Sequence, residues 1–65
     1  MLSEKAKLFK EEYILYVIYN SINTPAEVIR KELEATPFKI IMDMAIDDGL
    51  IESYDDVYEK EIQWN

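Results

Sequence analysis

Hydrophobic residues recur at helical spacing along the first third of the chain. From Ser3 to about Ile22 no glycine or proline interrupts the pattern, and Ser3 is a residue type that caps helix N-termini. The predicted helix carries two neighbouring apolar stripes, one of Leu8, Leu15, Ile18 and Ile22 and one of Phe9, Tyr13, Tyr16 and Val17. A strand is the competing prediction for residues 13–19, which are mostly aromatic or β-branched. The Lys, Glu and Ala residues before this segment favour the helix.

The first Thr-Pro pair predicts the beginning of a second helix. Thr24 is the expected N-cap, Pro25 occupies the first helical position, and Glu27 completes a capping box. This helix is expected to run to about Leu33. Its inward side chains are predicted to be Ala26, Ile29 and Leu33, with Val28 assisting, and its outward ones Arg30, Lys31 and Glu34.

The second Thr-Pro pair, Thr36 and Pro37, predicts a third helix after a tight turn. It is expected to end at Gly49, because the left-handed backbone position after a helix end favours glycine. Its predicted core side carries Phe38, Ile41, Met42, Ala45 and Ile46.

After Gly49 the pattern changes to alternation. Tyr58, Lys60, Ile62 and Trp64 alternate with Glu59, Glu61 and Gln63, a period of two that is typical of a strand with one buried face. Asp55-Asp56 would form the hairpin turn, although it lacks the glycine of an Asp-Gly turn. A final helix from Asp55 to Ile62 is the alternative. The sequence therefore predicts a mostly α fold, with a three-helix core and a short C-terminal β-hairpin, or an all-α chain if the tail is helical.

Length and composition point to one domain, residues 1–65, and exclude most small-domain chemistry. The chain has 65 residues, 49% of them hydrophobic, and contains neither cysteine nor histidine. Thiol nucleophiles, thiolate metal sites and histidine-based catalysis are therefore excluded, and we expect a non-enzymatic protein with no cofactor and no metal.

The longest apolar run is far short of the roughly 20 residues of a membrane span. No signal peptide is evident, so we expect a cytoplasmic location, and the single Arg among many Ile and Lys residues is typical of an AT-rich bacterial or phage genome.

The order of the predicted elements resembles the winged helix-turn-helix family. The segment from Met42 to Glu52, Met-Asp-Met-Ala-Ile-Asp-Asp-Gly-Leu-Ile-Glu, looks like the end of that family's recognition helix leading into its first wing strand. The resemblance covers about residues 13–64, and it implies that the third helix would be the one that DNA-binding members place in the major groove. The outward stripe of this helix is Lys39, Asp43 and Asp47, with Asp48 at its end. These carboxylates do not suit a surface that contacts phosphates.

The charge is divided unevenly along the chain. Residues 1–42 hold six basic and six acidic groups, whereas residues 43–65 hold Lys60 against eight acidic groups, which accounts for the whole net charge of −7. A DNA-binding relative would be positive where this chain is negative. We therefore expect a small acidic regulatory protein that binds and modulates another protein with a basic surface, such as a transcription factor, by presenting a DNA-like negative surface.

The residues expected to carry these functions fall into two groups. The predicted partner-binding residues are Ile40, Asp43, Met44, Asp47, Asp48, Tyr54, Asp55, Asp56 and Trp64. The predicted interface of a homodimer consists of Phe9, Tyr13, Tyr16 and Val17 on the first helix.

Four alternatives stay open at this point. The acidic residues could only solvate the surface, and the chain could be a structural subunit. The C-terminal Tyr58, Ile62 and Trp64 could fold back and cover the apolar stripe of the first helix. The alternative function is a dimeric winged-helix transcriptional regulator that presents Arg30, Lys31 and Lys39 to the DNA backbone.

Overall fold

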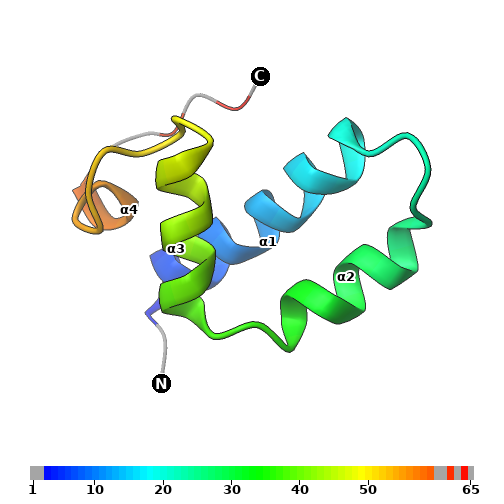
Figure 1. Cartoon of the computed structure of the whole chain (residues 1–65). Helices are drawn as coiled ribbons and strands as arrows, with labels where there is room; N and C mark the ends of the chain where they lie inside the picture. The colour runs from blue at the N-terminus through cyan, green and yellow to red at the C-terminus, as the bar shows by residue number, and fades with distance from the viewer. Residues whose placement is uncertain (1–2, 60–61, 63, 65) are drawn as a thin grey trace.

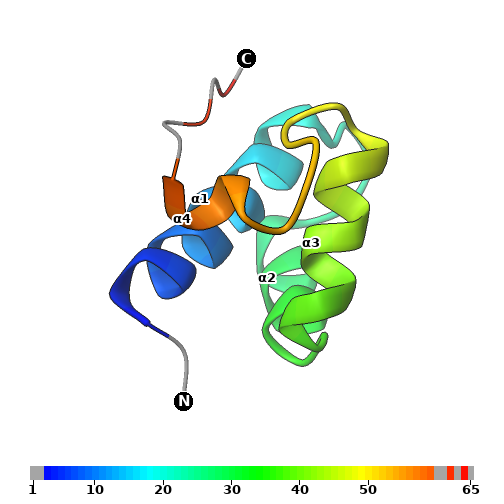
Figure 2. The same ribbon diagram turned by 90° about the vertical axis from the view of Figure 1, so that its left-hand side faces the viewer.

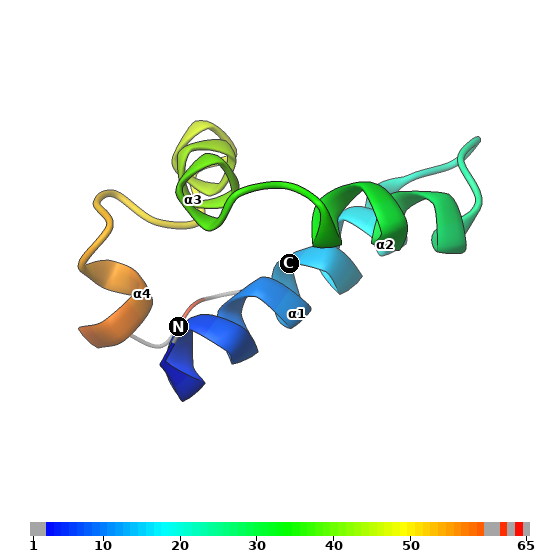
Figure 3. The ribbon, with the colours of Figure 1, turned by 90° about the horizontal axis from the view of Figure 1, so that it is seen from below.

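The computed structural model describes residues 3–59, 62 and 64, which contain four helices, and the last three of these pack against the first. The helices are α1 (Glu4–Asn20), α2 (Ala26–Glu34), α3 (Phe38–Asp47) and the one-turn α4 (Asp56–Glu59) (Figure 1). The helix α1 contacts the other three. Seen from below, α4 lies beside the N-terminal half of α1 and α2 beside its C-terminal half (Figure 3). The mostly α prediction is confirmed.

The helix α1 begins where the sequence predicts. The Ser3 hydroxyl oxygen accepts a hydrogen bond from the Ala6 N–H at 3.2 Å and so caps the helix. The stripe that enters the core is the one that contains Phe9 and Tyr13, together with Ala6 and Ile14. The other predicted stripe stays largely exposed: Leu8 is 60% exposed, and Ile22 lies beyond the end of the helix.

The predicted capping box of α2 does not form. The N-cap is Pro25, and no side chain caps the helix, although Thr24 and Glu27 have the right spacing. Ile29 and Leu33 are buried as predicted, whereas the predictions for Ala26 and Val28 are wrong because both side chains are exposed. Ala26 lies on the same face as Ile29, so the first turn of α2 extends beyond the core that buries its later turns.

The second Thr-Pro pair acts on both sides of its turn. The Thr36 hydroxyl donates to the Glu32 carbonyl at 2.7 Å, so Thr36 closes α2, and Pro37 is the N-cap of α3. Gly49 adopts the left-handed conformation with φ of +79°, as predicted. Its N–H donates to the Ile46 carbonyl and the Leu50 N–H to the Ala45 carbonyl, both at 3.0 Å. These two bonds satisfy the last carbonyls of α3 in a Schellman motif. The predicted core side of α3 is confirmed, with Ile41, Met42 and Ala45 buried and Phe38 and Ile46 packed against the core.

The predicted C-terminal hairpin is wrong where the structure describes it. Residues 3–59, 62 and 64 contain no strand. The two acids expected to form the hairpin turn lead into α4 instead, because the Asp56 carboxylate accepts from the Glu52 N–H at 2.8 Å and lies 3.5 Å from the Ser53 hydroxyl. Ser53 and Asp56 have the spacing of a capping box. Lys60, Glu61 and Gln63 of the predicted second strand lie outside the described residues.

The C-terminal segment packs back onto α1. The Trp64 ring centroid lies 5.7 Å from that of Phe9 and 5.7 Å from that of Tyr16, and Ile62 also packs against the core. Phe9 meets Phe38 of α3 edge to face at 6.1 Å. Ile62 and Trp64 therefore cover the aromatic stripe of α1, while Tyr58 remains 41% exposed.

Candidate functional site

The outward face of α3 and the connection to α4 form one acidic surface. Figure 2 shows α3 along one side of the molecule, with this connection leaving its C-terminal end. Ile40, Asp43 and Asp47 share the outward face of α3, because they are three and four residues apart. We call this the acidic surface, and it consists of Ile40, Asp43, Asp47, Asp48, Tyr54 and Asp55. All of these residues are exposed except Asp43, which is half-buried.

Two tyrosines tie carboxylates of the acidic surface to the fold. The Tyr54 hydroxyl donates to Asp43, whose carboxylate also lies 4.0 Å from the Lys39 ammonium. The Tyr13 hydroxyl donates to Asp48 at 2.9 Å and so joins α1 to the end of α3. Burial and then this hydrogen bond raise the pKa of Tyr13 above its ordinary value of 10.0. The pKa of Tyr54 is raised first by its bond to Asp43 and then by desolvation.

Asp47 and Asp55 differ from these two carboxylates. Among the residues that the structure describes, neither side chain has a hydrogen bond or an ion pair. Both are exposed, so they are free to meet a charged group from another molecule without loss of an internal bond.

Three of the predicted partner-binding residues lie elsewhere. Met44 is half-buried against the core. Asp56 is only 8% exposed, and its carboxylate holds the beginning of α4 in place. Trp64 packs on the aromatic rings of α1. The acidic surface is therefore smaller than the predicted set.

The basic groups of the alternative DNA-binding prediction are largely neutralised within the molecule. The Arg30 guanidinium makes two bonds to the Glu11 carboxylate, at 2.9 and 2.7 Å, and lies 3.6 Å from Glu34. The hydrogen bond from Arg30 lowers the pKa of Glu11. Lys39 is paired with Asp43. Within the described residues this leaves Lys31 as the one exposed cation of the three without a carboxylate partner.

The predicted dimer-interface residues are mostly internal. Phe9 and Tyr13 are 3% and 2% exposed and belong to the core, and Tyr16 and Val17 are half-buried. The exposed apolar face of α1 lies next to them and carries Leu8, Leu15 and Tyr19. Leu8 and Leu15 belong to one of the two predicted apolar stripes, and Tyr19 does not stand out from the pattern, although the spacing of seven and four residues between the three is visible in the sequence.

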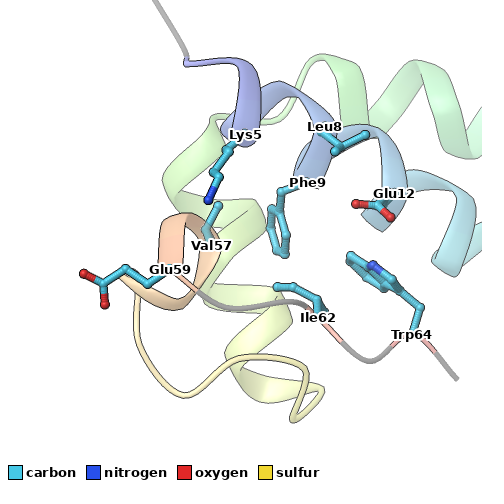
Figure 4. Close-up of a pocket in the computed structure, with 8 residues that line it drawn as sticks. All are labelled: Lys5, Leu8, Phe9, Glu12, Val57, Glu59, Ile62 and Trp64. Carbon is cyan, nitrogen blue, oxygen red and sulfur yellow. The ribbon is translucent and has the colours of Figure 1, made fainter.

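Two adjoining hollows follow this face. The first, of about 460 Å³, lies between α1 and the C-terminal segment, and its walls include Leu8, Glu12, Val57, Ile62 and Trp64 (Figure 4). The second, of about 330 Å³, is lined by Leu15, Tyr16, Tyr19 and Asn20. Glu12 and Trp64 line both, so the two hollows form one groove along α1, named the α1 groove below.

Neither a metal site nor a membrane span emerges from the described part of the chain. No group of three or more acidic side chains there is arranged to hold a metal ion. None of its helices has the length and apolar content needed to cross a membrane.

Comparisons with protein-family models, curated proteins and solved structures gave no match. The resemblance to winged helix-turn-helix proteins therefore stays a prediction.

Proposed function

We propose that this chain is a small non-enzymatic regulatory protein that binds another protein through its acidic surface. The partner has a basic surface of the kind that DNA-handling proteins such as transcription factors use for phosphates, and binding modulates its activity. The observation that carries the proposal is the set of carboxylates on the outward face of α3 and the connection to α4, beside the exposed Ile40 and Tyr54.

The physical argument combines charge with apolar contact. Carboxylates steer a basic partner and orient it, but they add little affinity while they stay hydrated. Ile40 is 45% exposed and Tyr54 is 37% exposed, and aromatic and aliphatic groups of this kind supply binding energy at interfaces. The internal pairing of Arg30 with Glu11 supports a protein partner over duplex DNA, because a cation already neutralised by a carboxylate contributes less to counterion release from phosphates.

The test uses charge removal at the two carboxylates that have no internal partner. The doubly substituted Asp47→Asn, Asp55→Asn protein should fold like the wild type. Immobilised wild-type protein should retain a basic protein from a lysate of the source cell, identified by mass spectrometry. The substituted protein should retain much less of it, and association with the purified partner should become slower and less salt-dependent.

The matched control removes two exposed carboxylates from α2, by Glu27→Gln and Glu32→Gln, and should retain the partner like the wild type. Equal retention by both substituted proteins would contradict the role of the acidic surface. A gel-shift titration at low salt addresses the alternative function, since tight duplex binding that is lost on substitution of Lys31 would favour the DNA-binding regulator. Light scattering on the same samples tests the homodimer expected from the sequence.

A further inference from the structure

The α1 groove combines apolar walls with charged side chains: Glu12 lines both hollows, and Lys5 and Glu59 line the first. Glu12 lies one turn from Leu8 and about one turn from Leu15 on the same face of α1. Its side chain is half-buried and lines both hollows, and within residues 3–59, 62 and 64 it makes no hydrogen bond and no ion pair. The Lys5 ammonium in the same groove donates to the Tyr58 carbonyl at 2.8 Å. A half-buried carboxylate in apolar surroundings is costly unless a cation approaches it.

The spacing along the groove fits a helix. Leu8, Glu12, Leu15 and Tyr19 follow one another at intervals of four, three and four residues, the pattern by which two helices pack side by side. At 1.5 Å per residue the stripe is about 16 Å long, or three helical turns. The exposed fractions of Leu8, Leu15 and Tyr19 are 60%, 37% and 83%, so all three are available to a ligand.

A second copy of this chain is a poor occupant. A twofold axis through the middle of the stripe would place the two Glu12 carboxylates about 4.5 Å apart along the helix axis, given the rise of an α-helix. Two carboxylates at that distance on a dehydrated seam repel each other. An occupant that brings a cation to this point is favoured instead.

We propose that the α1 groove binds an amphipathic helix of a partner protein, whose apolar stripe fills the two hollows and whose Lys or Arg pairs with Glu12. The proposal rests on the proposed function, in that the chain binds a basic protein, and it adds a second contact surface and the form of the partner's segment. This is the helix-in-groove mode of recognition.

The test uses a synthetic probe and the single tryptophan of the chain. The probe is an 18-residue helical peptide without tryptophan, with leucines at intervals of three and four residues and lysines at the other positions. Because Trp64 lines both hollows, binding should shift its fluorescence to shorter wavelength and saturate at one peptide per chain. Glu12→Gln should weaken binding about fivefold, as expected for loss of a partly buried charge pair, and Tyr19→Ser about tenfold.

Two controls separate groove binding from general attraction to an acidic protein. Glu32→Gln removes an exposed carboxylate from α2 and should leave the affinity unchanged. A peptide of the same composition with leucines at alternate positions cannot form a helical stripe and should bind at least tenfold more weakly. Circular dichroism checks that every protein variant is folded.

Several results would overturn the proposal. One is a Trp64 fluorescence spectrum that does not change when the helical peptide is added. Others are equal weakening of peptide binding by Glu12→Gln and Glu32→Gln, and equal affinity for the two peptides. The last is a homodimer that Tyr19→Ser dissociates. The two proposals can fail independently. If Asp47→Asn, Asp55→Asn abolishes capture of the basic partner while Tyr19→Ser does not affect it, the acidic surface is supported and the role of the α1 groove is contradicted. The reverse pattern would remove the acidic surface and leave the groove.

Discussion

The hydrogen bond between Tyr13 and Asp48 gives the sharpest test of how this fold is held together. It joins α1 to the end of α3 at 2.9 Å, from a tyrosine whose side chain is 2% exposed. Tyr13→Phe removes the hydroxyl and keeps the ring, which stacks on Phe9 and Tyr16. The substitution therefore isolates one hydrogen bond from the packing around it.

The expected cost follows from the surroundings of the two groups. A hydrogen bond to a charged group contributes about 1.5–3 kcal/mol. Asp48 is exposed and can regain water when the hydroxyl is lost, so the lower end, about 1.5 kcal/mol, applies. Since 1 kcal/mol shifts the unfolding midpoint of a domain this size by about 4–8 °C, Tyr13→Phe should lower the midpoint by about 6–12 °C. Thermal unfolding followed by circular dichroism measures this shift.

The pH dependence provides a second, independent readout. The folded-state pKa of Tyr13 lies above the ordinary 10.0 because of burial and the bond to Asp48. The resulting stability is fully present below pH 10 and is lost as the pH rises through the folded-state value. Wild-type protein should therefore lose stability more steeply above pH 10 than Tyr13→Phe, in which the weaker contribution of Tyr54 remains. An unchanged midpoint together with equal alkaline slopes would refute the reasoning.

Two further substitutions, at Gly49 and Asp56, test local features of the backbone, and thermal unfolding measures their effect on stability. Gly49→Ala should cost about 1–2 kcal/mol, the penalty of a side chain in left-handed backbone, because φ is +79° and the added methyl group would meet nothing within 4 Å. Gly49→Asn should cost less, and equal costs would contradict this cause. Asp56→Ala should destabilise by about 1–3 kcal/mol because it leaves the Glu52 N–H without its acceptor, whereas Asp56→Asn should retain part of that stability because its amide oxygen can still accept from the Glu52 N–H. A stable Asp56→Ala protein would show that this hydrogen bond is dispensable.

The three long helices could be predicted because their signals are local. Ser3 and Gly49 act through the backbone within one helical turn, and the structure confirms both. The hairpin prediction rests on an alternating pattern that takes no account of side-chain bonds to the local backbone. The Asp56 carboxylate makes such a bond by accepting from the Glu52 N–H, and the missing glycine between the proposed strands is the weakness of that prediction.

The candidate site was less predictable because it depends on which faces the tertiary packing leaves open. Periodicity shows two apolar stripes on α1 but cannot say which one enters the core. That choice is made by Trp64 and Phe38, which pack on Phe9 from distant parts of the chain. The same holds for Arg30, whose partner Glu11 is 19 residues away. The outward position of Asp47 on α3 was predicted, since it follows from helical spacing alone.

The small number of buried side chains in α2 affects how this helix moves within the folded state. All nine residues of this helix are described, and two of its side chains, Ile29 and Leu33, are buried. The salt bridge between Arg30 and Glu11 is partly exposed to solvent, so its contribution to stability falls as the salt concentration rises. Amide hydrogens of α2 should therefore exchange with deuterium through local opening, while those of α1 and α3 await global unfolding. We therefore expect α2 to open locally before the rest of the fold unfolds.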